Sequence, residues 1–132
     1  MLKWITALAL IMNGIGHIVF FFAAWTAVPM GFLDNPWILP GAFTVQSAVG
    51  KVSALIWLFA MAGFVVAGIG LLARKAWWPS LAVVAAVISL AVIIPWWNTI
   101  DSSTRFWAAL ADIVVIAAFA LPWKKRVIAS LT

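Results

Sequence analysis

Long runs of apolar residues divide this chain into four segments. They extend over about 4–28, 52–73, 77–97 and 106–123. A membrane-spanning helix needs about 20 mostly apolar residues to cross a hydrocarbon core about 30 Å thick, and each segment reaches or approaches that length. None alternates polar and apolar residues as barrel strands do, so the pattern favours helices. We therefore predict an all-α, polytopic membrane protein, a four-transmembrane-helix bundle that forms a single domain over 1–132.

The connections between these segments differ in length and composition. Residues 74–76 form a tight hairpin, whereas 98–104 make a short polar connection. That connection offers the fourth helix three capping residues, Ser102, Ser103 and Thr104. The first connection, 29–50, contains several prolines and glycines and cannot be one helix. Because it is still largely apolar, we expect a partly ordered outer loop that either folds over the bundle end or lies in the membrane interface. A short helix near 42–49 that leads into the second span is compatible with this pattern.

The basic residues are distributed unevenly between the two ends of the predicted bundle. One end carries Lys3, Arg74, Lys75, Lys124, Lys125 and Arg126. The other carries Lys51 and Arg105, offset by Asp34 and Asp101. Since Lys and Arg are enriched in cytoplasmic loops, we predict that both the N- and the C-terminus are cytoplasmic and that the long loop faces outward. We expect the protein to reside in the plasma (inner) membrane of a prokaryote.

Eight of the ten tryptophans lie near the predicted membrane boundaries, where an indole ring finds both apolar and polar surroundings. The inner boundary has Trp4, Trp77, Trp78 and Trp123, and the outer boundary has Trp25, Trp96, Trp97 and Trp107. At 1.5 Å per residue the first span covers about 31 Å between its two tryptophans. This length matches a bilayer core and supports the assigned spans.

Composition narrows the functional classes. Hydrophobic residues make up 67% of the chain and charged residues 8%, against about 25% charged in ordinary soluble domains. This excludes a soluble enzyme and a disordered tail. The chain has no cysteine, which excludes thiol redox chemistry and Cys-ligated metal centres. We attribute the net charge of +5 to membrane topology, and we expect no nucleic-acid partner.

A few polar side chains fall inside the predicted spans, where they are costly and often functional. Each span places one at a depth of about 7–12 Å below the outer boundary: His17, Trp57, Ser89 and Asp112. Asn13 lies on the same helix face as His17, one turn further in, and Lys51 lies at the outer boundary. The clustering predicts a pocket open to the outside that binds the polar head of a quinone or a lipid-like molecule, or relays protons.

Two other interpretations of these residues remain open. Polar side chains between membrane helices often only fix helix register, each contributing about 0.6 kcal/mol. His17 is also a conceivable axial haem ligand, although the chain has no second histidine. Depth along a helix does not determine which way a side chain points, so the pattern leaves open whether His17 and Asp112 face each other. The sequence indicates neither a catalytic residue nor a metal site.

Several segments resemble the DoxX-like group of small membrane proteins. They are the glycine-rich turn Asn13-Gly14-Ile15-Gly16-His17, the long outer connection, and a second span punctuated by glycine at Gly63, Gly68 and Gly70. The resemblance covers most of the chain. It implies a four-helix bundle and, because some members associate with quinone-linked sulfur oxidation, a role close to a quinone.

Three functions are compatible with these features. We favour a non-enzymatic membrane protein that binds a hydrophobic ligand in an outward-facing polar pocket. The alternatives are an accessory subunit of a larger membrane complex and an oligomeric, proton-coupled transporter of small molecules. The expected partners are membrane lipids, together with a membrane-protein partner or further copies of the chain.

Overall fold

The computed structural model describes residues 1–26, 28, 30–33, 36–38 and 41–131, and every regular element in that part of the chain is a helix. The helices are α1 (Leu2–Gly16), α2 (Ile18–Trp25), α3 (Ala48–Leu72), α4 (Trp78–Ile93), α5 (Ser102–Ala120) and α6 (Lys124–Leu131). The all-α class expected from the apolar pattern is confirmed.

Three helical stretches are long and apolar enough to cross a membrane: Leu2–Trp25 (α1 with α2), α3 and α5. The predicted third span, 77–97, is helical only as α4, whose 16 residues extend about 24 Å. Residues 94–99 continue as turns. The described part of the chain therefore has three helical stretches that could span a membrane by length and composition, and one shorter apolar helix.

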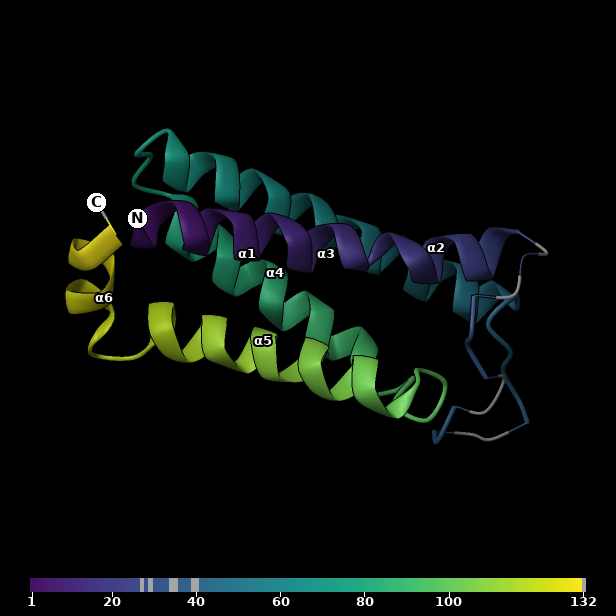
Figure 1. Ribbon diagram of the computed structural model, residues 1–132. Helices are drawn as coiled ribbons and strands as arrows, with labels where there is room; N and C mark the ends of the chain where they lie inside the picture. Colours follow the sequence, from purple (N-terminus) through teal and green to yellow (C-terminus); the bar gives the residue numbers. More distant parts are fainter. Residues whose placement is uncertain (27, 29, 34–35, 39–40, 132) are drawn as a thin grey trace.

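The chain turns back at two opposite ends of the helices (Figure 1). The terminal end holds both chain termini, α6 and the hairpin between α3 and α4. The loop end holds the described residues of the connection between α2 and α3, and the turns 94–101. All six basic residues predicted for one side belong to segments at the terminal end.

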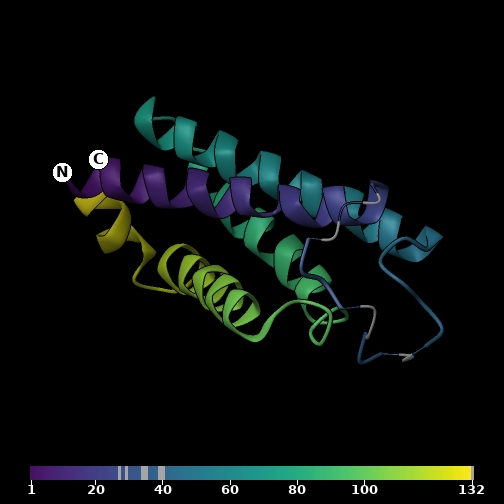
Figure 2. The same cartoon turned by 45° about the vertical axis from the view of Figure 1, so that its right-hand side comes forward.

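The helices pack in the order α1, α3, α4, α5, with α3 and α4 in the middle (Figures 1 and 2). Small residues let the backbones approach closely. A Cβ on Gly63 would lie 2.9 Å from the Cβ of Ala85 on α4, and one on Gly68 would lie 2.9 Å from the Ala7 carbonyl oxygen on α1. The glycines of α3 thus allow this helix to pack closely against both α1 and α4.

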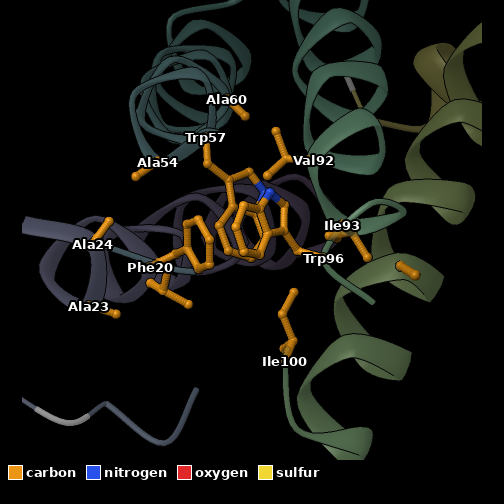
Figure 3. Close-up of a cluster of buried hydrophobic side chains, with 12 residues drawn as sticks. Phe20, Ala23, Ala24, Ala54, Trp57, Ala60, Val92, Ile93, Trp96 and Ile100 are labelled. Carbon is orange, nitrogen blue, oxygen red and sulfur yellow. The ribbon is translucent and has the colours of Figure 1, made fainter. Parts of the chain in front are cut away.

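Buried side chains form one hydrophobic cluster near each end of the bundle. Near the loop end, Phe20 packs edge-on against Trp57 and Trp96, with ring centroids 5.1 and 5.5 Å apart (Figure 3). Near the terminal end, Trp78 packs on Phe119 at 4.8 Å. Trp78 and Trp96 are therefore buried in the core, although their positions along the chain predicted a place at the membrane boundaries.

Two described residues of the long connection contact the loop end of the bundle. The Leu33 amide donates to the Thr99 carbonyl at 2.9 Å, and the Phe32 ring packs on Phe20 at 5.1 Å. The expected short helix near 42–49 is absent: residues 41–47 form turns, and α3 begins at Ala48. Asp34 of this loop lies outside the described residues.

The tight entry into α3 explains why that short helix does not form. The Ser47 hydroxyl accepts a hydrogen bond from the Gly50 amide at 3.2 Å and caps α3. A Cβ on Gly50 would lie 1.9 Å from the Val45 carbonyl oxygen. Glycine therefore allows the chain to fold back onto the first turn of α3.

The cap of α5 differs from the one expected. Asp101, and not Ser102, Ser103 or Thr104, is the capping residue, because its carboxylate accepts from the amides of Ser103 at 2.9 Å and Thr104 at 3.2 Å. Hydrogen bonds from the side chains of Thr104 and Ser103 lower the pKa of Asp101 to about 2. The exposed carboxylate is thus held ionised at the helix start.

The segment after the last predicted span forms a short amphipathic helix, α6, which the apolar pattern does not indicate. Its basic residues, Lys124, Lys125 and Arg126, are exposed. Val127, Ile128 and Leu131 pack on the hydrophobic cluster of the terminal end. The helix contacts both α1 and α5 and so lies across the end of the bundle.

Candidate functional site

His17 lies at the junction of α1 and α2 and is buried, with 3% of its surface exposed. Its Nδ1 lies 2.6 Å from the Asn13 carbonyl oxygen, one helical turn earlier, and its Nε2 lies 2.7 Å from the Ser89 hydroxyl on α4. The carbonyl oxygen can only accept, so this partner assigns the proton to Nδ1. Nε2 then accepts from the Ser89 hydroxyl. The ring is fixed in orientation by both nitrogens.

Ser89 links three helices through one fully buried hydroxyl. It receives a hydrogen bond from the Trp57 indole N–H on α3 at 3.2 Å and donates to His17. The His17 ring also packs edge-on against Trp57, with centroids 4.9 Å apart. Polar groups buried away from water are costly unless paired, and this chain of donors and acceptors pairs them.

Asn13 connects this network to α5. Its side-chain N–H donates to the Asp112 carboxyl oxygen Oδ1 at 3.3 Å. Asp112 is fully buried, and its second oxygen, Oδ2, has no hydrogen-bond partner within the described residues. His17 and Asp112 therefore share Asn13 as a neighbour, one through its backbone and the other through its side chain.

The structure thus brings together five of the six residues singled out in the sequence. His17, Asn13, Trp57, Ser89 and Asp112 come from α1, α3, α4 and α5 and meet at one level of the bundle. Lys51 lies elsewhere: its ammonium group packs over the Trp25 ring, 5.4 Å from the centroid.

A cavity of about 400 Å³ opens between α1 and α5 beside this network. Its lining residues are Met12, Asn13, Gly16, His17, Trp57, Ser103, Thr104, Trp107 and Ala108. Ser89 and Asp112 lie behind the cavity wall, where they hold His17 and Asn13 in place. The cavity reaches the first turn of α5, so it lies toward the loop end of the bundle.

Sequence reasoning missed the contribution of α5 to this wall. Thr104, Ala108 and Asp112 follow one another at intervals of four residues, which places them on one face of a helix. The same spacing on α1 groups Asn13 with His17. The apolar run of the fourth span begins only after Thr104, so a search inside the spans excluded the hydroxyls of the first turn.

Two glycines of α1 have different surroundings, which shape the cavity. A Cβ on Gly14 would lie 2.9 Å from both the Met61 carbonyl oxygen and the Cβ of Phe64, so Gly14 sets the close approach of α1 to α3. A Cβ on Gly16 would meet nothing within 4 Å. Gly16 lines the cavity, and its missing side chain leaves space there.

The groups that face the cavity suit recognition of a small polar head. The Asn13 side chain uses one N–H on Asp112, and the hydrogen bonds within the described residues leave its amide oxygen Oδ1 and its second N–H for a ligand. The Trp57 and Trp107 rings supply apolar surface. No three His, Cys, Asp or Glu side chains of the described residues come together as metal ligands.

Comparisons with protein-family models, with curated proteins and with solved structures found no match.

Proposed function

We propose that this chain is an integral membrane protein of a prokaryotic plasma membrane that binds a hydrophobic ligand, a quinone or a lipid-like molecule, in the cavity between α1 and α5. In this proposal four apolar segments span the membrane, with α4 completed by the turns that follow it. Both termini are cytoplasmic and the cavity lies in the outer half. The role is binding and not catalysis.

The distribution of charge supports this orientation. The terminal end carries six Lys and Arg residues, and the loop end carries two. Positive residues are retained on the cytoplasmic side of a membrane. The cavity beside His17 lies toward the loop end and so opens in the outer leaflet.

The cavity beside Asn13 is the observation that carries the functional proposal. A polar network that only fixed helix register would be sealed on all sides by packed side chains. Here Asn13 and His17 line a space of about 400 Å³, within the range of small-molecule sites, about 300–1,000 Å³. Mostly apolar walls with a few fixed polar groups are typical of ligand sites.

A quinone head fits the available groups in both of its redox states. The second side-chain N–H of Asn13 can donate to a quinone carbonyl, and its side-chain oxygen Oδ1 can accept from a hydroquinone hydroxyl. The Trp107 ring, which is 65% exposed, provides a flat apolar contact, and the buried Trp57 adds a small part of the wall. The resemblance to DoxX-like proteins points toward the same ligand class. A lipid-like molecule with one compact hydrogen-bonding head fits the same groups.

Titration calorimetry in lipid nanodiscs with a benzoquinone that carries no side chain tests this proposal. We expect saturable binding to the wild-type protein and about tenfold weaker binding to Asn13→Leu, since one lost hydrogen bond of about 1.4 kcal/mol corresponds to that factor. Asn98→Leu is the matched control, because Asn98 is exposed and lies outside this cavity.

A second variant tests the position of the site independently of Asn13. Gly16→Leu extends a side chain into the cavity from a position with no neighbour within 4 Å, and it should weaken binding without impairing folding. Equal affinity of the wild type, Asn13→Leu and Gly16→Leu would contradict the proposal. It would favour a register-fixing network in an accessory subunit.

A further inference from the structure

An apolar groove of about 370 Å³ runs along the terminal half of the bundle, between α1, α5 and α6. It exists because α1 packs on α3 and α5 packs on α4, so α1 and α5 face each other across a gap with little direct contact. On α1 it is lined by Leu2, Ile5, Thr6, Ala9, Leu10 and Asn13. Its α5 wall consists of Ala111, Val114, Val115, Ala118 and Phe119.

Asn13 lines both this groove and the polar cavity, so the two spaces are neighbours. The hydrogen bond from Asn13 to Asp112 joins α1 to α5 at this point. Asp112 is fully buried, whereas Asn13 borders both spaces. The two spaces therefore meet at Asn13, and the groove is the nearest apolar space for the remainder of a molecule seated in the cavity.

The polarity of the lining changes along this path. The cavity presents Asn13, His17 and Thr104, whereas the groove beyond Asn13 is almost wholly apolar, with hydroxyls only at Thr6 and Ser130. A ligand with a polar head and an apolar chain matches this order. The reverse orientation would place its chain among the hydrogen-bonding groups.

The dimensions of the groove limit the length of the apolar chain that a ligand could place there. From Asn13 to Leu2 is 11 residues of α1, or about 16 Å, which is about half the thickness of a bilayer core. That is the reach of one apolar chain in one leaflet. At about 370 Å³ the groove is near the lower limit for small-ligand sites, which favours one chain over two.

The far end of the groove is closed by α6. Val127, Ser130 and Leu131 of this helix line it, and Leu131 is itself buried. The helix contacts both walls of the groove, α1 and α5. It therefore limits how far a chain can extend toward the basic residues at the membrane surface.

We propose that the ligand is a single-chain amphiphile whose head occupies the cavity beside Asn13 and whose apolar chain lies in the groove toward α6. This inference rests on the proposed function and specifies its ligand class. It accounts for an apolar groove that continues from a polar cavity and ends at an amphipathic helix.

The experiment compares the chain-free benzoquinone with the same quinone carrying a decyl chain, by titration calorimetry in nanodiscs. Ala9→Trp fills the groove from α1, and Ala62→Trp is the matched control, since Ala62 is exposed on α3 away from the groove. We expect Ala9→Trp to weaken binding of the decyl quinone about tenfold and to leave binding of the chain-free quinone unchanged. Partition of the chain into lipid is the same for all variants.

The outcomes separate the two proposals. If Ala9→Trp and the control bind both quinones equally, the chain lies outside the groove and the inference is overturned. A wild-type protein that binds neither quinone overturns the proposed function and, with it, the inference. Ala118→Phe, which fills the groove from α5, should reproduce the selective loss and replaces Ala9→Trp if that variant does not fold.

Discussion

Single residues at the site combine a packing role with a binding role. The two glycines that precede His17 illustrate the difference, because one is in close contact with α3 and the other faces the cavity. The sequence motif does not separate them: both are glycines on the last turn of the same helix. Only the rotation of α1 about its axis, which packing on α3 determines, assigns a role to each.

Alanine substitutions should separate these roles. Gly14→Ala should lower the free energy of unfolding by about 1–3 kcal/mol, because its Cβ would press on the Met61 carbonyl and force α1 away from α3. Gly16→Ala should leave it unchanged or raise it by up to about 1 kcal/mol, since alanine favours a helix and meets no neighbour. Reversible unfolding in mixed micelles measures both, and equal effects would contradict the packing assignment.

The hydrogen bond between Asn13 and Asp112 gives a second prediction. Asp112→Leu should lower the free energy of unfolding by about 1 kcal/mol, the scale of a hydrogen bond between membrane helices. Asp112→Asn keeps an oxygen that accepts from Asn13 and should lower it far less. The same unfolding assay applies. A leucine variant as stable as the asparagine variant would show that this bond does not hold α5 to α1.

Depth could be predicted from sequence at this scale, and rotation could not. The rise of 1.5 Å per residue places His17, Trp57, Ser89 and Asp112 at a similar level. In the structure one hydrogen-bonded network contains all four, with Asp112 joined to it through Asn13. That Asn13, and not His17, bonds Asp112 depends on how α1 and α5 rotate about their axes. Packing on α3 and α4 sets this rotation, and the apolar pattern does not predict it.

At the scale of elements, helix ends follow capping chemistry more than hydropathy. The predicted spans 52–73 and 106–123 begin about one turn later than α3 and α5 do. Ser47 and Asp101 start these helices by accepting backbone N–H bonds before the apolar run begins. Apolar composition reports contact with lipid, whereas a helix begins where its first amides find acceptors.

The cap of α5 gives a prediction for acid conditions. The folded pKa of Asp101 lies near 2, below its ordinary value of 3.8, so its stabilising effect is present above about 3.8 and is lost as the pH falls toward 2. Unfolding measured across this range should show the wild type losing more stability than Asp101→Asn. Subtracting one curve from the other removes the contribution of the other carboxyl groups. Parallel curves would contradict the cap assignment.

At the scale of the whole molecule, the basic segments and the cavity lie at opposite ends of the bundle. Both termini, the α3–α4 hairpin and α6 lie at the basic end (Figure 1). The cavity is lined by the last turn of α1 and the first turns of α5, so it lies toward the opposite end. The sequence predicted the grouping of the ends because charge and chain direction determine it. It did not predict the groove, which arises because α1 and α5 pack on different central helices.

Cysteine labelling tests the proposed orientation. The chain has no cysteine, so each introduced thiol reports one site. Ala129→Cys on α6 should react with a membrane-impermeant maleimide only in broken cells, and Val28→Cys in the loop should react in intact spheroplasts. Both positions are exposed in the fold. The reverse pattern would invert the topology and place the cavity on the cytoplasmic side.

The most direct test of the central claim is photoaffinity labelling in nanodiscs with an azidoquinone, followed by peptide mass spectrometry. The account predicts that labels fall on the last turn of α1 near Gly16 and on the first turns of α5, and that excess chain-free quinone prevents them. Labels spread over the lipid-facing surfaces of all helices, insensitive to competitor, would contradict a binding site between α1 and α5.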